Sequence, residues 1–332
     1  MKNKSTDRII LLDTSIGTEN AGDLIIMDAV RKQLRSIFSR DFFVSFPTHD
    51  TLGKSAYSWH KQSEFTFLGG TNLLSGRFIG RNTAQWKAGF RDTGEFNDVI
   101  GIALGWQSYN DNIGKLRVPR QLLQKYFYSK IFSNSFLHSV RDSYTQKKLL
   151  KLGINSINTS CVTMWNLTED HLSKIKRQKS DTVVLTITDY HLSQDRLDSY
   201  RKMIEIALTN YSFVYLWLQS PNDYSLLSNI DIEGFEKIRI LPPDLRRYDS
   251  ILEKGVDYIG TRLHAGIRSL QKGNRTLIIE VDNRATEIAK DTNLPTLNYK
   301  NIDQLDDWIN HDQIMDIHIP FDRIAEWKAQ FE

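Results

Sequence analysis

Short apolar runs alternate with longer amphipathic stretches along the chain. Segments 8–12 (RIILL), 182–186 (TVVLT) and 276–281 (TLIIEV) are rich in aliphatic and β-branched residues and predict buried strands. The stretches 23–38 and 196–208, which follow the first two of these runs, are predicted to be helices. Because strands that alternate with helices form parallel sheets covered by helices, the pattern predicts an α/β fold.

The same alternation continues through the rest of the chain. Further strands are predicted at 65–68, 99–104, 135–140, 213–218, 238–241 and 256–259, and further helices at 142–152, 245–254 and 286–291. The polar and basic segment 166–180 interrupts the pattern and predicts a helical or irregular connector between domains. We therefore expect two α/β domains, at 1–170 and 171–332, with parallel sheets facing a cleft. The amphipathic segment 321–332 is expected to pack back on the first domain.

One predicted strand-to-helix turn, in the segment 256–273 (VDYIGTRLHAGIRSLQKG), carries several groups that can bind an anion. Gly260 and Thr261 end the strand, and the helix is predicted to begin near Leu263 or His264. The first turn of such a helix presents unpaired backbone N–H groups and the positive end of the helix dipole.

Cationic side chains accompany this turn. Arg262 and His264 add hydrogen-bond donors to it, and Arg268 follows about one and a half turns later. The combination predicts a site for a phosphate or a carboxylate. The alternatives are that Arg262 pairs with a carboxylate of the protein and that His264 only caps the helix.

Ligands of open α/β sheets bind at the carboxyl ends of the strands, so the other loops in that position are candidates too. In the first loop, Gly17 and Gly22 allow tight turns, Asn20 tolerates a left-handed conformation, and Asp23 is expected to cap the next helix. The loop has neither the Gly-Lys-Ser/Thr of a Walker A motif nor the G-x-G-x-x-G spacing of dinucleotide-binding folds.

Two further loops offer room for a ligand. The paired glycines Gly69 and Gly70 follow a predicted strand and would let a ligand approach the backbone. Trp106 and Tyr109 lie close to a glycine after the next strand, where an exposed aromatic face would suit a sugar ring. Packing of the tryptophan in the core is an equally good interpretation.

Arg141 lies at a third corner of this kind. It precedes a helix that Asp142 can cap, which would direct the guanidinium into the cleft. A surface ion pair is the alternative for Arg141.

Composition limits the function classes. With Cys161 as the only cysteine, no intrachain disulfide can form, and we expect a buried side chain, not a nucleophile. The net charge of +3 is too small to indicate nucleic-acid binding. No run approaches the roughly 20 apolar residues of a membrane span, so a cytoplasmic protein is expected. The basic cluster 174–179 is interpreted as a solvated face, with contact to anionic lipid as the alternative.

Four short motifs, taken together, resemble those of the polysaccharide pyruvyl transferase family. Asn20-Ala-Gly-Asp23 is similar to the family's N-x-G-D loop, and Gly69-Gly70 to its glycine-rich second loop. Ser139-Val-Arg-Asp142 is similar to its S-x-R-D element, and Gly260-Thr-Arg-Leu-His264 to its R-L-H motif. The order of the motifs is kept over nearly the whole chain. One departure is the sequence CVTMW at 161–165, where a proline after the cysteine is usual in the family.

The resemblance implies a fold and a reaction. The fold would be a glycosyltransferase-B-like pair of Rossmann-like domains, with the acceptor on the N-terminal side and the donor on the C-terminal side. The reaction would transfer the enolpyruvyl carbon skeleton of phosphoenolpyruvate onto two hydroxyls of a sugar and form a pyruvate ketal. By position, Arg141, Arg262 and His264 would bind the donor or take part in catalysis. The acceptor would be a lipid-linked or nucleotide-linked sugar, which is compatible with peripheral association at the inner face of the membrane.

The chemistry of phosphoenolpyruvate agrees with these residues, because its carboxylate and its phosphate each match a guanidinium fork. We expect His264 to donate a proton or to stabilise the departing phosphate. We expect Asp23 to accept the proton of the sugar hydroxyl, with Asp142 as the alternative. No redox cofactor is required and no compact metal-binding cluster is evident, so a metal-independent enzyme is expected. The expected donor-binding residues are Arg141, Gly260, Thr261, Arg262, His264 and Arg268, and the expected acceptor-binding residues are Asn20, Gly69, Gly70, Trp106 and Tyr109, with Trp59 and Trp86 as further sugar platforms.

Two other functions fit the same sequence. A nucleotide-sugar glycosyltransferase on the same architecture could use Glu280, Asp282 or Glu287 to bind a ribose. A noncatalytic glycan-binding subunit is the second alternative, although such a subunit has no reason to keep three cationic residues in one cleft.

Overall fold

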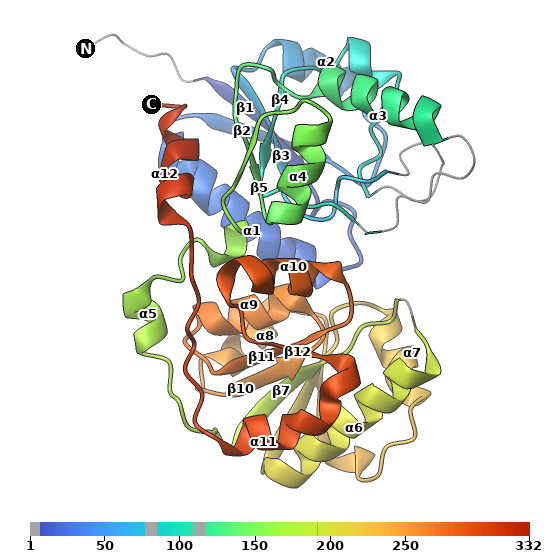
Figure 1. Cartoon of the computed structure of the whole chain (residues 1–332), viewed down its shortest axis with the longest axis vertical. Coiled ribbons are helices and arrows are strands. Elements are labelled where there is room, and N and C mark those ends of the chain that lie inside the picture. The colour runs from blue at the N-terminus through green and yellow to red at the C-terminus, as the bar shows by residue number, and fades with distance from the viewer. Residues whose placement is uncertain (1–6, 77–84, 108, 110–116, 191) are drawn as a thin grey trace. The chain divides into compact units, whose positions relative to one another are not determined.

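A computed structural model describes residues 7–76, 85–107, 109, 117–190 and 192–332 (Figure 1). The chain divides into two compact units. Unit 1 comprises Met1–Thr18, Ile26–Trp165 and Pro320–Glu332, and unit 2 comprises Glu19–Ile25 and Asn166–Ile319. The main division thus falls after Trp165, slightly before the expected boundary at residue 170.

Unit 1 is built on a four-stranded parallel sheet with the strand order β2-β1-β3-β4, beside a parallel pair formed by β5 and β6. A bridge between Leu104 and Val140 connects the end of β4 to β5. The strands are β1 (Arg8–Asp13), β2 (Phe42–Pro47), β3 (Phe65–Gly69), β4 (Val99–Ile102), β5 (His138–Val140) and β6 (Ser156–Asn158). The helices are α1 (Ala21–Ile37), α2 (Lys54–Lys61), η1 (Asp92–Gly94), α3 (Arg117–Ile131), α4 (Ser143–Lys151), η2 (Val162–Met164) and α12 (Phe321–Ala329). The first residues of α1, up to Ile25, belong to unit 2.

Unit 2 contains a six-stranded parallel sheet with the order β12-β11-β10-β7-β8-β9. The strands are β7 (Thr182–Thr186), β8 (Phe213–Trp217), β9 (Ile238–Leu241), β10 (Asp257–Gly260), β11 (Thr276–Glu280) and β12 (Thr296–Asn298). The helices are α5 (Glu169–Ser173), α6 (Gln194–Asn210), α7 (Asn222–Ser228), η3 (Phe235–Lys237), α8 (Leu245–Leu252), α9 (Leu263–Gln271), α10 (Asn283–Thr292), η4 (Tyr299–Gln304) and α11 (Leu305–Asn310). The direction of winding reverses between β7 and β10, so this pair is the switch point at which Rossmann-like sheets bind ligands.

Burial explains why the strands are uninterrupted apolar runs. Helices cover both faces of a parallel sheet, so the side chains on both faces of each strand are shielded from water. In unit 2 the core unites Val183 and Leu185 of β7 with Leu216 of β8 and with Ile259 of β10. Where a helix approaches most closely, Gly266 of α9 faces β11, because a Cβ at that position would lie 2.6 Å from Cγ1 of Ile278.

The C-terminal helix α12 belongs to unit 1. Trp327 is buried there and packs edge-to-face on Trp165 and Phe67, with ring centroids 5.8 and 6.3 Å apart. Phe331 follows the helix and contacts Phe38 and Phe67.

Four strands and helices of unit 1 were not predicted from the sequence: β2, α2, α3 and β6. The short 3-10 helices η1 and η2 were not predicted either. Among the described strands, β2 pairs only with β1 at the edge of the sheet. Its residues are mostly half-buried, so its apolar pattern is weak. The segment predicted as a connector contains the short helix α5. Within the described part of the chain, no helix is both long enough and apolar enough to cross a bilayer.

Candidate functional site

The turn between β10 and α9 lies at the switch point of unit 2. Gly260 ends β10 against β7, where a Cβ would meet Oγ1 of Thr186 at 2.3 Å. Thr261 donates its N–H to the carbonyl of Thr186 at 3.0 Å and its hydroxyl to Thr188 at 2.8 Å. Arg262 is the N-cap residue of α9, which begins at Leu263 as predicted. The close approach of two backbones therefore fixes the position of the arginine.

Arg262 is 4% exposed and its guanidinium is held on one edge. Nε donates to the carbonyl of Ile187 at 2.8 Å, and Nη2 forms ion pairs with Asp223 and, at 3.3 Å, with Asp189. Nη2 also donates to Oγ of Ser220 at 2.9 Å. The alternative of pairing with a carboxylate is therefore confirmed. Nη1, however, makes no hydrogen bond with any residue that the structure describes.

The carboxylate of Asp223 organises the loop after β8. It is fully buried and accepts the N–H groups of Gln219 and Ser220 at 2.8 and 3.0 Å, and the hydroxyl of Ser220 at 2.8 Å. The sequence prediction missed Asp189, Ser220 and Asp223. These residues could have been found from their position, because they lie in the loops just after β7 and β8, as Arg262 lies just after β10.

A second arginine of unit 2 lies beside Arg262. Tyr190, which follows β7, has the Cζ of Arg262 5.8 Å and the Cζ of Arg284 5.3 Å from its ring centroid. Arg284 follows β11 and pairs with Asp282, which also accepts the hydroxyl of Tyr190 at 3.3 Å. Two guanidinium groups thus flank one aromatic ring at the carboxyl ends of adjacent strands.

His264 and Arg268, both on α9, have different surroundings. His264 is the second residue of the helix and is buried. Arg268 lies in the last turn, where Nε and Nη2 bond both carboxylate oxygens of Asp249 at 2.8 and 2.7 Å. This fork joins α9 to α8 at the end of the helix away from His264. Arg268 therefore has a structural partner in α8, and its role in donor binding stays a prediction.

In unit 1, Arg141 follows β5 and is almost completely buried. Nη2 donates to Oδ1 of Asn72 at 2.5 Å and Nε to Oδ2 of Asp142 at 3.0 Å. Asp142 caps α4 by accepting the N–H of Thr145 at 2.6 Å, as predicted. The alternative of a surface ion pair is wrong, because both charged groups are buried. Nη1 of Arg141 is buried without a hydrogen-bond partner among the described residues.

The aromatic residues near Arg141 differ in exposure. Trp106 is 1% exposed and packs in the core of unit 1 beside Tyr128, so its expected role as a sugar platform is corrected to core packing. Trp86 is buried in the same core, and Trp59 is only half-buried. Tyr109 is 51% exposed and remains the predicted platform of this loop.

The two glycines after β3 are required by packing within unit 1. A Cβ at Gly69 would lie 2.8 Å from Cε and Sδ of Met27. A Cβ at Gly70 would lie 2.2 Å from the carbonyl oxygen of Ala103 and 2.5 Å from that of Ile102. The neighbouring strand end fills the space that we expected a ligand to use. Their contact with the acceptor stays a prediction.

The start of α1 differs from the expectation in one respect. The helix begins at Ala21, and Oδ1 of Asn20 accepts the N–H of Gly22 at 3.0 Å, so Asn20 and not Asp23 caps it. Oδ1 of Asn20 also accepts a hydrogen bond from Nε2 of Gln219 at 2.7 Å. Asp23 is buried within the first turn, and its role as a base stays a prediction.

The residues proposed for ribose binding have partners within unit 2. Glu280 accepts the hydroxyls of Thr286 and Thr296 at 2.9 and 2.6 Å. Asp282 caps α10 and pairs with Arg284, and Glu287 pairs with Lys290. Because every one of these carboxylates is already engaged, the structure offers no support for the ribose assignment.

Cys161 is buried, and its burial raises the pKa of the thiol, which disfavours the reactive thiolate. Over the described ranges, no group of three or more His, Cys, Asp or Glu residues could hold a metal ion.

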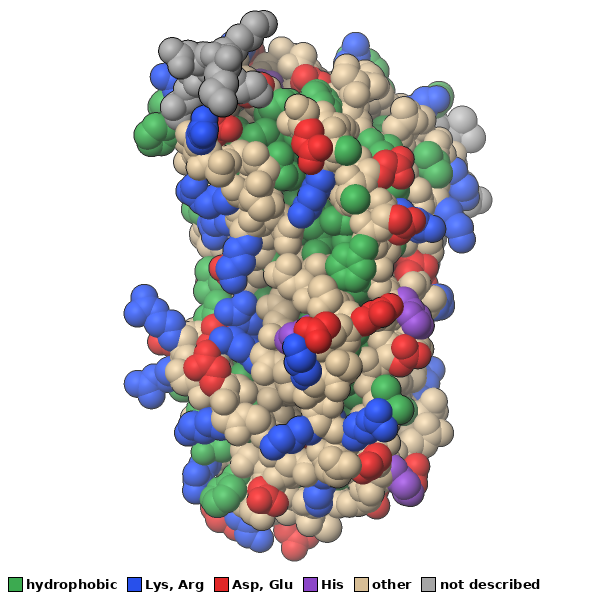
Figure 2. Space-filling model, turned by 90° about the vertical axis from the view of Figure 1, so that its left-hand side faces the viewer, with side chains coloured by type: hydrophobic (Ala, Val, Ile, Leu, Met, Phe, Trp, Pro, Cys, Tyr) green, Lys and Arg blue, Asp and Glu red, His purple; other side chains and the backbone are tan. Residues whose placement is uncertain are grey.

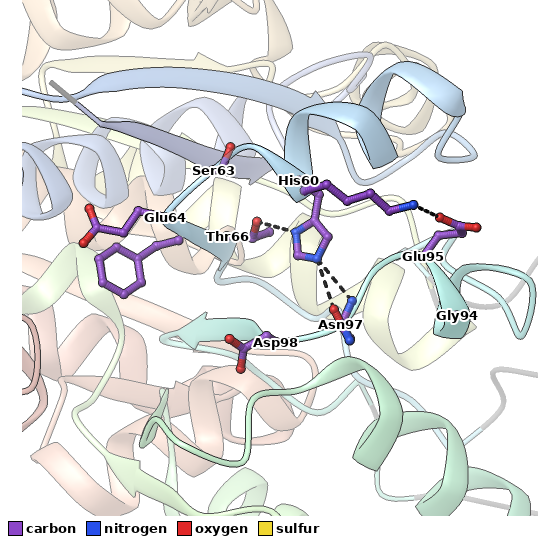
Figure 3. A pocket seen from close by; sticks show the side chains of 10 residues that line it. His60, Ser63, Glu64, Thr66, Gly94, Glu95, Asn97 and Asp98 are labelled. Atoms are coloured by element: carbon purple, nitrogen blue, oxygen red, sulfur yellow. Dashed lines mark hydrogen bonds and ion pairs between the residues drawn. The ribbon is translucent and has the colours of Figure 1, made fainter. Parts of the chain in front are cut away.

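A separate pocket of about 330 Å³ lies at the amino ends of β3 and β4 (Figure 3). His60 forms one side of it, with Nδ1 2.8 Å from Oγ1 of Thr66 and Nε2 3.4 Å from Oδ1 of Asn97. Burial lowers the pKa of His60. None of the predicted site residues lines this pocket, which lies at the opposite edge of the sheet from Arg141.

Comparisons with known proteins agree on family and fold. The family model for polysaccharide pyruvyl transferase matches residues 20–283. A putative UDP-N-acetylglucosamine 2-epimerase from Listeria monocytogenes is 12% identical in sequence, with a TM-score of 0.54 over 99% of this chain and 97% of that chain. The S. aureus MnaA-UDP co-structure is 11% identical, with a TM-score of 0.57 over 95% of this chain and 92% of that chain. The Methanocaldococcus jannaschii UDP-GlcNAc 2-epimerase in complex with UDP-GlcNAc and UDP is 12% identical, with a TM-score of 0.55 over 95% of both chains. No curated protein matches the sequence.

At these identities the solved structures share only the fold with this chain, and they confirm the expected class of two Rossmann-like α/β domains of the glycosyltransferase-B-like type. The family follows from the sequence model. It spans residues 20–283 of the 332 and includes the motifs that contain Arg141, Arg262 and His264, and the chain therefore belongs to the polysaccharide pyruvyl transferase family.

Proposed function

We propose that the protein transfers the enolpyruvyl unit of phosphoenolpyruvate to two hydroxyls of a sugar, which forms a pyruvate ketal and releases phosphate. The observation that carries the proposal is the pair of arginines in unit 2. Arg262 and Arg284 flank Tyr190 at the carboxyl ends of the neighbouring strands β10 and β11, next to the switch point. Two guanidinium groups at one edge of a sheet suit a small molecule with two anionic groups.

Hydrogen bonds from the arginines are expected to contribute more to the binding of phosphoenolpyruvate than the net charge of the site does. Asp223 and Asp189 already balance the charge of Arg262, and Asp282 balances that of Arg284. The gain from an anion therefore comes from donors that point at it. Nη1 of Arg262, which bonds no described residue, is the proposed donor of this kind.

The reaction needs a proton donor and a base. A proton adds to the methylene carbon of phosphoenolpyruvate and leaves an oxocarbenium-like centre at C2, where the first sugar hydroxyl forms a C–O bond. The C2–O bond to phosphate then breaks, phosphate leaves, and the second hydroxyl attacks C2 and closes the ketal. We assign the proton donation, or the stabilisation of the departing phosphate, to His264 because it lies beside Arg262 in the first turn of α9.

Asp23 is the proposed base for the sugar hydroxyl, and Arg141 a further donor-binding residue. Neither step requires a redox cofactor or a metal. The proposed acceptor is a sugar that is attached to a lipid or a nucleotide, with Asn20 and Tyr109 among its contacts.

Binding of phosphoenolpyruvate to the full chain tests the donor site. We expect Arg262→Lys and Arg284→Lys each to raise the dissociation constant about thirtyfold, because a charged hydrogen bond contributes about 2 kcal/mol. Isothermal titration calorimetry measures the change. Arg239→Lys, at an exposed position near the opposite end of the sheet, serves as the matched control and should bind like the parent. If both site variants are folded and bind phosphoenolpyruvate with the affinity of the parent, these arginines of unit 2 do not bind the donor.

His264→Gln tests the chemical step. With a sugar acceptor that supports phosphate release, we expect kcat to fall at least a hundredfold while the KM for phosphoenolpyruvate changes little. A thermal shift with uridine or guanosine diphosphate sugars, and none with phosphoenolpyruvate, would select the glycosyltransferase instead. Binding of glycan alone would select the noncatalytic subunit.

A further inference from the structure

The outer face of α3 in unit 1 exposes large apolar side chains. Leu122, Leu123 and Tyr126 are all exposed, and Leu122 retains 64% of its surface. The opposite side of the same helix, with Phe127 and Ile131, lies in the core of unit 1. The solvent-facing side of α3 is therefore apolar as well as the side that packs in the core.

Neighbouring elements extend this apolar surface. Phe90, from the loop before η1, is exposed and stacks on Tyr126 with ring centroids 6.5 Å apart. A Cβ at Gly153, just after α4, would lie 3.8 Å from Cε of Lys125, so the end of α4 adjoins α3, as Figure 1 also shows. Leu150 of α4 is exposed as well. We name these residues and their lysines the α3–α4 face: Phe90, Leu122, Leu123, Lys125, Tyr126, Lys130, Lys147, Leu150 and Lys151.

The charge of this face has one sign. Neither the sequence of α3 (RVPRQLLQKYFYSKI) nor that of α4 (SYTQKKLLK) contains an Asp or a Glu. The four lysines of the face are all exposed. Nearby, Asp92 is buried and bonded to Tyr57, and Glu95 is paired with Lys61. By contrast, basic and acidic side chains are interspersed on the side of the molecule in Figure 2, and the whole chain carries only +3.

We propose that the α3–α4 face docks on the surface of a bilayer that contains anionic lipids. Exposed leucines and aromatic side chains on a helix that also carries lysines are the composition of helices that lie in the membrane interface. The apolar side chains enter the boundary between headgroups and acyl chains, and the lysines face the lipid phosphates. A second copy of the chain fits less well, because a two-fold contact would bring the same lysines against one another.

Docking of this kind is independent of the pyruvyl transfer proposed above. It rests only on the exposed residues of unit 1, and vesicle binding by the full chain tests it without any catalytic assay. Vesicles of phosphatidylcholine alone are compared with vesicles of phosphatidylcholine and phosphatidylglycerol, by cosedimentation at low and at high salt. We expect binding to the anionic vesicles only, and weaker binding at high salt.

Variants locate the binding surface. Each Lys→Gln change is expected to lower the partition coefficient about fivefold, so Lys125→Gln with Lys130→Gln should lower it about 25-fold. Leu122→Ser with Leu123→Ser should also abolish most of the binding. The matched controls are Lys174→Gln with Lys176→Gln in the basic cluster 174–179, and Ile314→Ser, whose side chain is as exposed as that of Leu122 at 64%. Both controls should bind like the parent.

Several results would overturn the proposal. They are an absence of binding to anionic vesicles, equal binding to neutral vesicles, or a loss of binding only in the basic-cluster control. Sedimentation velocity adds one more. A dimer that dissociates in the Leu122→Ser, Leu123→Ser variant, together with no vesicle binding by the parent, would assign the face to a second copy of the chain.

Discussion

Arg141 and Arg262 lie in different units but are held in the same manner. In each, a carboxylate fixes one edge of the guanidinium: Asp142 bonds Nε of Arg141, and Asp223 pairs with Nη2 of Arg262. In each, Nη1 has no hydrogen-bond partner in the described ranges of the chain. Nη1 of Arg141 is also buried, and a buried donor without a partner costs free energy that a bound anion would recover. This arrangement suits arginines that are positioned for a ligand.

Gly105 is the residue that makes room for Arg141. A Cβ at Gly105 would lie 2.3 Å from Cζ and 2.4 Å from Nε of Arg141, whose buried guanidinium cannot swing away without leaving Asn72 and Asp142. We expect Gly105→Ala to lower the free energy of unfolding by about 1–3 kcal/mol, the usual cost of overpacking. It should also weaken phosphoenolpyruvate binding as much as Arg141→Ala does. Urea unfolding and calorimetry measure the two effects.

Gly94→Ala is the control for this prediction. Gly94 has no atom within 4 Å of an added Cβ and has no left-handed backbone, so both measurements should match the parent. Parent-like binding by Gly105→Ala would show that Arg141 does not need its observed position.

Among the elements, the strands of unit 1 are flanked by residues with left-handed backbones, Asp98 before β4 and two more at the carboxyl edge. Ala103, just after β4, and Ser160, just after β6, have left-handed backbones with φ of 51° and 63°. Such a conformation costs a residue with a side chain about 1 kcal/mol, and it is typical of functional edges. The N–H of Ala103 donates to Oγ of Ser139 at 2.8 Å, so the strain is held by hydrogen bonds between adjacent strand ends.

Strand β5 contains a histidine that makes stability depend on pH. His138 is fully buried, accepts the N–H of Gly101 at Nδ1 and lies 2.9 Å from the carbonyl of Ser133 at Nε2, so the neutral ring fits both contacts. Burial lowers its pKa from 6.5 to about 4. As the pH falls below 6.5, His138 becomes protonated in the unfolded chain, whereas in the folded chain it stays neutral down to about pH 4.

The free energy of unfolding should therefore decrease on this account by about 3 kcal/mol between pH 6.5 and pH 4, and not above pH 6.5. Urea unfolding at several pH values, for the parent and for His138→Gln, measures it. The variant lacks the titrating ring, so the difference in stability between the two proteins should shrink toward acid pH. A constant difference across this range would contradict the buried neutral histidine.

At the scale of the whole molecule, unit 1 is completed by the last residues of the chain. Trp327 of α12 is fully buried against Phe67 and Trp165, which come from β3 and from the end of η2. Gln330 also exchanges hydrogen bonds with the backbone of Leu137 at 2.8 and 3.1 Å. Segments distant in sequence therefore share one core.

We expect Trp327→Ala to lower the stability of unit 1 by about 3–5 kcal/mol, since a large buried aromatic side chain leaves a cavity. Phe321→Ala, in the same helix but at an exposed position, should cost less than about 1 kcal/mol. Chemical unfolding followed by tryptophan fluorescence and circular dichroism compares them. Equal stability of the two variants would mean that α12 does not contribute to the core of unit 1.

The α/β class, most of the strands and the start of α9 at the turn that carries Arg262 could all be predicted from the amino-acid sequence. These features are local, because apolar runs, caps and glycines act over a few residues and need no knowledge of distant partners. The family motifs also belong to this level, since each lies within a single strand-to-helix turn.

The partner of each polar group could not be predicted, because it depends on how the chain packs. The tertiary structure placed Asp223 and Asp189 on Arg262, brought Arg284 beside Tyr190, assigned Arg268 to Asp249, and buried Trp106. The carboxylates that bond Arg262 and Arg268 lie 19 to 73 residues away from them in sequence, and only the packing of strands and helices in unit 2 brings them together. A local pattern shows that a charged residue stands at a strand end, but its neighbours across the sheet determine whether that charge is free for a ligand.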